Sequence, residues 1–404
     1  MKIVYLHQYF TTPEMSGGTR SYEFARRLVA AGHEVHMITS DRVGDGSIYE
    51  SDVDGIHVVW IPVAYSNKMG PASRIRAFLS FAVKSARYAS RIKADIVFAT
   101  STPLTIAIPG IYAKVRQRIP MVFEVRDLWP ETPIGLGVIS NPVLKLAART
   151  LERIAYAQSD QIIALSDGMK DGVISSGYPA ERVSVVPNSS DIDRFHVDAE
   201  LGRRFRREHD WLGDRPLLVY TGTFGYANDV GYMVHLADET LRIDREIRFL
   251  AIGDGKEVDQ VRALAMKKGV LNRNFFLMPS MRKDLLPVVL SAATMTSSWV
   301  RNVKEMRANS ANKFFDSLAA SRPIAINYEG WQADILRQHQ AGLVLSPTDY
   351  CSAAKTLVTH ISSSEWLNQA GRNAFRLAET QFSRDLLFEQ FENVLLTTIT
   401  NDGE

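Results

Sequence analysis

The chain has 404 residues, a formal net charge of +2 and an apolar fraction of 46%. This length predicts two domains of about 200 residues each, and the near-neutral charge excludes the composition of a general nucleic-acid-binding protein. The single cysteine, Cys351, excludes an internal disulfide and fits a reducing compartment. No apolar run approaches the roughly 20 residues that a membrane span requires, and the apolar run at 3–6 is too short for a signal peptide. We therefore expect a cytoplasmic protein.

Short apolar runs alternate with amphipathic helices along the first half of the chain. One such helix is predicted over residues 21–31 and ends at Gly32. The strand candidates are residues 3–6, 34–39, 58–62, 96–99, 121–125 and 161–164. Strands that alternate with helices in this way pair in parallel and form an open α/β sheet.

The second half starts the same pattern afresh, after a turn cluster at 188–191. Its strand candidates are residues 217–220, 248–252, 274–277, 293–296, 324–326 and 343–345. Two consecutive doubly wound parallel sheets predict two Rossmann-like domains that face an interdomain cleft, with ligands at the carboxyl ends of the strands. We expect an N-terminal domain over 1–195, a C-terminal domain over 205–375, and a C-terminal helix over 376–404 that packs back on the N-terminal domain.

Glycine-containing turns follow three of the predicted strands. Adjacent backbone N–H groups can approach a phosphate closely where glycine removes the side chain. None of the turns is a complete G-x-G-x-x-G or a P-loop, so each is either a tight strand-to-helix turn or a ligand-binding loop. Their common position at one edge of each sheet favours nucleotide binding. The turns contain Gly17 and Gly18, Gly222 and Thr223, and Gly253 and Gly255.

A helix is predicted to begin at Asn309 or Ser310, whose side chains can cap the first free N–H groups. Asn312 and Lys313 fall in or near its first turn, where unpaired N–H groups attract phosphate. Asp316, three residues after Lys313, could accept hydrogen bonds from sugar hydroxyls. The run therefore suits a nucleotide diphosphate sugar, although a surface helix with one ion pair between Lys313 and Asp316 is the simpler interpretation.

The end of the strand at 121–125 carries an unusual concentration of charge. Glu124, Arg126 and Asp127 could act as an acid, a base or ligands of sugar hydroxyls, or Arg126 and Asp127 could pair and stiffen the loop. His7, at the end of the first strand, is a further candidate substrate contact. The histidines show no H-x-x-x-H spacing, so we expect no metal site.

A basic amphipathic helix is predicted over residues 74–93. It could lie on an anionic membrane surface, or it could be a domain helix with a solvated face. Its apolar face would hold Ile75, Phe78, Leu79, Ala82, Ala86 and Ala89, and its basic face Arg76, Lys84, Arg87 and Arg91. Further positive charge in the same half, which favours a membrane or diphosphate partner, comes from Lys114, Arg116, Arg118, Lys145, Arg149 and Arg153.

Motifs over nearly the whole chain carry a family resemblance. They lie at residues 3–10 with 17–18, and at 124–130, 164–169, 185–188, 252–255 and 312–320. With these motifs the chain resembles the glycosyltransferase family four enzymes of the GT-B fold. Within that family it is similar to bacterial O-antigen and capsule transferases such as the N-acetyl-L-fucosamine transferases.

The resemblance implies how a nucleotide sugar would be held, mainly by the second domain. Asp316 matches the second acid of the family's E-x7-E motif, which grips the ribose hydroxyls. The first acid is replaced by Ala308, and Glu305 lies near enough in sequence to substitute. The family's Arg and Lys after the first strand of the second domain are missing, so Lys313, Arg307 or Arg301 would neutralise the diphosphate. Arg126 stands where the family has a catalytic-loop histidine.

The activity implied by the resemblance is retaining transfer of a sugar without a cofactor or a metal. The donor would be a UDP-linked N-acetylated hexosamine or deoxyhexosamine, and the acceptor a glycan on a polyprenyl diphosphate at the inner face of the cytoplasmic membrane. Asp127 and Arg126 would orient the sugars, and Lys313 would stabilise the leaving group. A nucleotide-sugar epimerase of the same fold and a non-catalytic nucleotide-sugar-binding protein are the alternatives.

Overall fold

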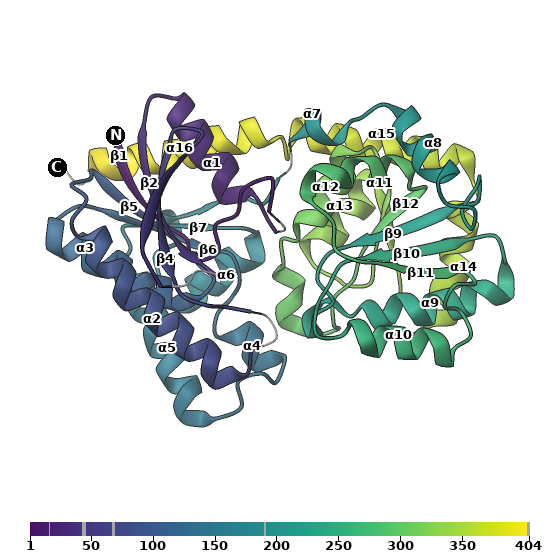
Figure 1. The fold of residues 1–404 in the computed structure, drawn as a ribbon, viewed down its shortest axis with the longest axis horizontal. Helices are drawn as coiled ribbons and strands as arrows, with labels where there is room; N and C mark the ends of the chain where they lie inside the picture. The colour runs from purple at the N-terminus through teal and green to yellow at the C-terminus, as the bar shows by residue number, and fades with distance from the viewer. Residues whose placement is uncertain (16, 43–45, 67–68, 190, 402–404) are drawn as a thin grey trace. The chain divides into compact units, whose positions relative to one another are not determined.

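The computed structural model describes residues 1–15, 17–42, 46–66, 69–189 and 191–401. The chain divides into two compact units. The first comprises Met1–Thr12, Gly18–Pro187 and the chain from Leu387 onward, and the second comprises Pro13–Gly17 and Asn188–Leu386. Figure 1 shows each unit as a central sheet with helices on both faces.

The first unit is built on an eight-stranded sheet. Its strand order is β3-β4-β2-β1-β5-β6-β7-β8, and all neighbours pair in parallel except β3 and β4. The strands are β1 (Lys2–Leu6), β2 (Glu34–Asp41), β3 (Tyr49–Val53), β4 (Ile56–Pro62), β5 (Ile96–Thr100), β6 (Met121–Val125), β7 (Gln161–Ala164) and β8 (Val183–Val185).

Two strands of this sheet were not predicted, and both lie at its edges. β3 alternates polar and charged residues because it is largely exposed, and it folds back on β4 through a two-residue turn in which Asp54 and Gly55 both have positive φ. β8 has only three residues, too few for a clear apolar period. The six predicted strands of this half are all present.

Helices cover both faces of the first sheet. They are α1 (Arg20–Ala30), α2 (Pro71–Ala89), α3 (Ala107–Gln117), α4 (Glu131–Gly135), α5 (Pro142–Ala157), α6 (Asp167–Ser175) and α16 (Arg384–Asn401), with short 3-10 turns at Leu104–Ile106 and Ala180–Arg182. Ile3 and Tyr5 share a core with Phe24 of α1 and Phe391 of α16. The rings of Phe24 and Phe391 are 4.7 Å apart, so the last helix of the chain completes the core of the first unit (Figure 1).

The second unit is built on a six-stranded, fully parallel sheet. Its strand order is β11-β10-β9-β12-β13-β14. The strands are β9 (Leu217–Thr221), β10 (Arg248–Ile252), β11 (Phe275–Met278), β12 (Met295–Ser298), β13 (Ile324–Ile326) and β14 (Gly342–Val344). Alternate residues of β9 enter opposite cores: Leu217 and Val219 join one, and Leu218 and Tyr220 the other, as period-two side chains require in a sheet that is covered on both faces.

The helices of the second unit are α7 (Ile192–Phe195), α8 (Ala199–Arg207), α9 (Val230–Ile243), α10 (Val258–Lys267), α11 (Leu286–Ala292), α12 (Asn312–Ala319), α13 (Trp331–His339), α14 (Tyr350–Ile361) and α15 (Ser364–Thr380). Short 3-10 turns lie at Tyr226–Asn228, Lys283–Leu285 and Lys304–Ala308. Helices α9 and α14 pack on one core, and α12 and α15 pack on the other. The predicted fold class of two doubly wound parallel-sheet domains is confirmed.

A buried ion pair joins the strands of the first unit to its first helix. Arg20 is 1% exposed and Glu124 is fully buried. The Nε and Nη2 atoms of Arg20 donate to Glu124 Oε1 at 3.0 and 2.9 Å, and Thr100 Oγ1 donates to Glu124 Oε2 at 2.6 Å. Arg20 also donates to the carbonyls of Val186 and Pro187. This burial contradicts the expected substrate contact of Glu124, whose carboxylate oxygens are both used within the protein.

The substitution Glu124→Gln leaves the Arg20 guanidinium buried without its counter-charge. Removal of one partner of a buried pair costs about 3–5 kcal/mol, so we expect a marked fall in the melting temperature of the first unit. Calorimetry measures this change. Glu329→Gln is the matched control because Glu329 and Arg337 form an exposed pair, which is worth about 1 kcal/mol or less. Equal effects of the two substitutions would contradict the assignment.

Candidate functional site

Three glycines bring the backbone turns after β9 and β10 of the second unit into close contact. Gly222 N donates to Ile252 O at 2.9 Å. A Cβ on Gly253 would lie 1.8 Å from Gly222 O, and one on Gly255 would lie 2.3 Å from Phe224 O. Since no side chain fits at those distances, glycine is required at both positions. The sequence prediction placed these glycines at the carboxyl edge of the sheet, and the structure brings the two turns together there.

Lys313 of α12 extends its amine to the same turns. Its Nζ donates to Tyr220 Oη at 3.1 Å and to Asn228 Oδ1 at 3.5 Å, and it lies 4.2 Å from the centre of the Tyr220 ring. A Cβ on Gly222 would lie 2.9 Å from this nitrogen, so Gly222 makes room for the amine. Burial lowers the pKa of Lys313 to about 7. Within the described part of the chain, no carboxylate forms an ion pair with Lys313.

The start of α12 differs from the prediction. The helix begins at Asn312 after Ala311, and no side chain caps it. The predicted caps have other partners: Ser310 Oγ accepts from Asn188 N at 3.3 Å, and Asn309 Nδ2 donates to Met306 O at 2.6 Å. The prediction failed because these partners lie outside the helix. As a result, the N-terminal end of α12 keeps its positive dipole free of a side-chain acceptor.

Asp316, one turn further along α12, is buried and does not pair with Lys313. Its Oδ2 accepts from Lys283 Nζ at 2.9 Å, whereas Oδ1 is buried without a hydrogen-bond partner. Lys283 Nζ also lies 5.3 Å from the ring centre of Phe195. The simpler interpretation, an exposed ion pair between Lys313 and Asp316, is therefore wrong. Neither Lys283 nor Asn228 was a predicted site residue, because both are recognisable only from their distant partners.

Three other predicted residues of the second unit shortly precede α12 in the chain and have contacts of their own. Arg301 stacks on Tyr226 with its Cζ 3.7 Å from the ring centre, donates to Tyr226 O at 2.6 Å and pairs with Glu257 at 3.3 Å. Arg301 thus holds the loop that contains Thr223 and Asn228. Arg307 is exposed and Glu305 is partly buried, both in the 3-10 turn Lys304–Ala308.

In the first unit, His7 and Arg126 meet at the carboxyl edge of the sheet. Arg126 Nη1 lies 3.3 Å from His7 Nε2, and Arg126 N donates to Ser101 Oγ at 3.0 Å. His7 is 4% exposed, and burial together with the positive charges of Arg126 and Arg42 holds its pKa well below the usual range. Burial raises the pKa of Asp127 to about 6, although the charge of Arg126 opposes this shift.

The predicted glycine turn after β1 has a less defined role. Gly18 O accepts from Thr11 Oγ1 at 2.9 Å, and Gly17 has a φ of 139° that favours glycine. Both residues precede α1. Among the described residues, no three His, Cys, Asp or Glu side chains are grouped so that they could hold a metal ion.

Three helices of the first unit expose an unusual number of large apolar side chains. α2 packs beside α3, and α3 beside α5. We refer to the large exposed apolar residues and the cationic residues of these three helices together as the basic-apolar surface. Its apolar members are Ile75, Leu79, Val83, Tyr112, Val115, Val143, Leu144, Leu146 and Ile154, and its cationic members are Arg76, Lys84, Arg87, Lys114, Arg116, Lys145, Arg149 and Arg153.

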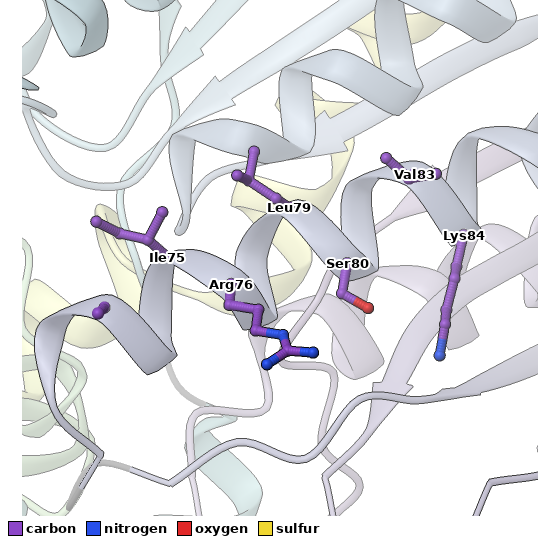
Figure 2. Close-up of a pocket in the computed structure, with 7 residues that line it drawn as sticks. Ile75, Arg76, Leu79, Ser80, Val83 and Lys84 are labelled. Carbon is purple, nitrogen blue, oxygen red and sulfur yellow. The ribbon is translucent and has the colours of Figure 1, made fainter.

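The apolar face expected on α2 is only partly buried. Ile75 and Leu79, which were expected on that face, are exposed beside Val83, which is 71% exposed. The core-facing side chains are Ala77, Phe81, Ala82, Ser85 and Ala89. Figure 2 shows Ile75, Leu79 and Val83 along one side of a shallow hollow of about 590 Å³, with Arg76 and Lys84 along the other. No helix in the described ranges is both long and apolar enough to cross a membrane.

Part of the chain is similar in sequence to known glycosyl transferases. Residues 17–189 match the family profile described as a glycosyl transferase 4-like domain. WcaI of Escherichia coli K12, whose name assigns it to colanic acid biosynthesis as a glycosyl transferase, is 28% identical over 301 residues, which cover 69% of this chain and 72% of WcaI.

Solved structures share the whole fold at low sequence identity. Anabaena Alr3699/HepE, in complex with UDP and glucose, has a TM-score of 0.74 and 15% identity, and the superposition covers 98% of this chain and 100% of HepE. Sucrose-phosphate synthase from Thermosynechococcus elongatus has a TM-score of 0.79 and 14% identity, with 99% of each chain covered. The chain therefore has the GT-B fold. Over residues 17–189 it is similar to the glycosyl transferase 4-like family, and over 69% of its length it is similar to WcaI.

The close approach of the two glycine turns predicts a strong effect of Gly253→Ala. The added methyl group would overlap Gly222 O, so the two turns must separate, and we expect a fall in melting temperature. Gly231→Ala is the control in the same unit, since the nearest atom to its Cβ would be 3.7 Å away and alanine favours a helix by about 1 kcal/mol over glycine. Calorimetry of both variants makes the comparison, and a Gly253→Ala protein as stable as Gly231→Ala would show that the contact between the turns does not require glycine.

Proposed function

We propose that this chain is a retaining glycosyltransferase of surface polysaccharide biosynthesis. It transfers an N-acetylated hexosamine or deoxyhexosamine from a UDP-linked donor to a lipid-linked glycan. The observation that carries the proposal is the amine of Lys313, which lies beside the Gly222 turn and pairs with no carboxylate of the residues that the structure describes. A cation held in this way, on the first turn of a helix, complements a diphosphate. HepE, which shares the fold, binds UDP and glucose.

In this proposal, the second unit stabilises the leaving group. The diphosphate gains negative charge as the bond from the sugar to its β-phosphate breaks, and the Lys313 ammonium and the first-turn N–H groups of α12 offset that charge. These groups supply the positive charge without a metal ion. Asp316 Oδ1, which has no partner among the described residues, accepts a hydrogen bond from a ribose hydroxyl while Lys283 holds Oδ2.

The acceptor side of the reaction is assigned to the first unit. Arg126 and Asp127 orient the sugars at the carboxyl edge of its sheet. The leaving phosphate removes the proton of the attacking hydroxyl on the same face of the donor sugar, so the anomeric configuration is retained. Asp127, with a pKa near 6, is ionised at neutral pH and accepts hydrogen bonds from sugar hydroxyls.

The substitution Lys313→Met tests the donor assignment. It keeps the length of the side chain and removes a charge that burial disfavours, so the fold should keep or gain stability. UDP affinity should fall about 10- to 100-fold, the usual value of a hydrogen bond to a charged group. Lys304→Met, which removes an exposed lysine, should leave affinity unchanged. Isothermal titration with UDP measures both variants.

The pH dependence of UDP binding follows from the same lysine. The free protein loses the Lys313 proton near pH 7, whereas a bound diphosphate favours the ammonium form, so affinity should fall by up to about tenfold per pH unit above neutrality. Binding at pH 8 should therefore take up a proton, which titrations in buffers of different ionisation enthalpy detect. Proton uptake that persists in Lys313→Met would contradict the assignment. Product analysis with and without a glycan acceptor separates transfer from epimerisation of the donor.

We also propose that the basic-apolar surface rests on the anionic inner face of the cytoplasmic membrane, where a polyprenyl-linked acceptor would be found. Large aliphatic side chains interspersed with arginine and lysine suit the boundary between headgroups and acyl chains. Exposed apolar area is unfavourable in water, and contact with a membrane would cover it.

Vesicle flotation tests the membrane proposal. At low salt, the protein should float with vesicles of phosphatidylglycerol and phosphatidylcholine but not with phosphatidylcholine alone. Leu79→Ser with Val83→Ser should weaken binding about tenfold or more because two aliphatic contacts are lost, and Arg76→Gln with Arg87→Gln should have a similar effect, since each cation contributes about 1 kcal/mol. Met266→Ser, at a residue of the second unit that is 65% exposed, is the control. If none of these four substitutions changes flotation, the basic-apolar surface is not the membrane-binding surface.

A further inference from the structure

Gln8 is a fully buried polar residue whose side chain has no partner. Its exposed fraction is 0%, yet neither Oε1 nor Nε2 forms a hydrogen bond with any residue that the structure describes. The backbone of the same residue is satisfied, because Gln8 O accepts from Ser40 N at 3.2 Å and from Thr39 Oγ1 at 3.3 Å. Buried amide groups are almost always paired, so the unpaired carboxamide points to a group that is not part of the polypeptide.

His7 has a second unpaired atom next to it in the chain. A guanidinium has only donors, so His7 Nε2, 3.3 Å from Arg126 Nη1, must be the acceptor in that contact. Neutral imidazole then carries its proton on Nδ1, which is buried and has no partner. His7 consequently offers one N–H donor, and its only lone pair is already used. It cannot act as a general base while Arg126 holds it.

These unpaired groups lie at the carboxyl edge of the central strands. His7 and Gln8 follow β1, Ser101 follows β5 and Arg126 follows β6, and β1, β5 and β6 are neighbours in the sheet. Ligands of open α/β sheets bind at this edge. The available groups are two donors, Nδ1–H of His7 and the amide N–H of Gln8, and one acceptor, Gln8 Oε1.

We propose that His7 and Gln8 form a subsite for a neutral pyranose in the first unit. A hydroxyl both donates and accepts, so two neighbouring sugar hydroxyls satisfy the carboxamide and the imidazole N–H together. An anion would leave Gln8 Oε1 facing negative charge, and an apolar ligand would leave all three groups unpaired. The inference rests on the proposed function, since it gives the acceptor glycan its position. Within that function, His7 and Gln8 act by binding the acceptor and not by moving a proton.

Gln8→Met tests the carboxamide. Methionine has nearly the same length and removes the polar atoms, which have no protein partner to lose. The melting temperature should therefore stay the same or rise, while the dissociation constant of a bound sugar should increase about tenfold or more. The probes are the methyl α-pyranosides of glucose, galactose and N-acetylglucosamine. Their binding to the full chain is measured by NMR titration.

The histidine is tested by a pair of amide substitutions. His7→Asn places an amide near the position of Nδ1, and His7→Gln places one near Nε2. We expect His7→Asn to keep most of the sugar affinity and His7→Gln to lose about as much as Gln8→Met. Equal loss in both would mean that the ring is needed only for packing and would overturn the role of the Nδ1 proton.

Three results would overturn the subsite. The first is that the wild-type protein binds none of the pyranosides. The second is that Gln8→Met binds them as tightly as the wild type, as expected if only water occupies the position. The third is that Gln8→Met unfolds at a much lower temperature, which would reveal an internal partner of the carboxamide. UDP titration of the same samples keeps the two proposals separate. If the wild-type protein does not bind UDP, the proposed function is contradicted. If it binds UDP but no pyranoside, only the inference about His7 and Gln8 is contradicted.

Discussion

The proposed donor site depends on a backbone contact that only glycine permits. Gly253 lies so close to the carbonyl of Gly222 that a methyl group cannot fit between them, and Gly222 in turn leaves space for the amine of Lys313. The turns after two neighbouring strands thereby form one polar surface with the start of α12. The amine of Lys313 contacts a phenol, a carboxamide and an aromatic ring there, none of which is a carboxylate. In the proposed function, the ammonium form of this amine is therefore available to a diphosphate.

The first unit contains buried polar groups of two kinds. The ion pair between Arg20 and Glu124 is saturated by Thr100 and by backbone carbonyls, so it fixes the sheet edge of the first unit and is unavailable to a substrate. His7 and Gln8 are also buried, but Nδ1 of His7 and the carboxamide of Gln8 have no hydrogen-bond partner among the described residues. This contrast distinguishes polar groups that hold the scaffold from the groups that we propose bind a sugar. Sequence position alone does not make that distinction, because Glu124 and Arg126 lie on the same strand end.

The fold could largely be predicted from the sequence, because parallel strands that are buried on both faces appear as continuous apolar runs. The prediction missed β3, whose exposed edge position allows charged residues, and β8, which is very short. It located the glycine turns by their position after predicted strands, and Lys313 and Asp316 by their position in a predicted helix. It could not find the partners of these residues, since Lys283 lies 33 residues from Asp316 and Tyr220 lies 93 residues from Lys313. On α2, it predicted an apolar face but not how much of that face is buried, and Ile75 and Leu79 are exposed.

The position of α16 has a consequence for how the chain can be divided. Phe391 packs against Phe24 and Phe98, and Leu387 and Leu395 enter the same core. A fragment cut at residue 190 would retain every strand of the first sheet but leave these aromatic rings uncovered. The N-terminal unit is therefore discontinuous in sequence, and an isolated version of it would need the last helix, supplied by a linker or as a separate peptide. Shortening the chain at its C-terminal end would damage the half that is encoded first.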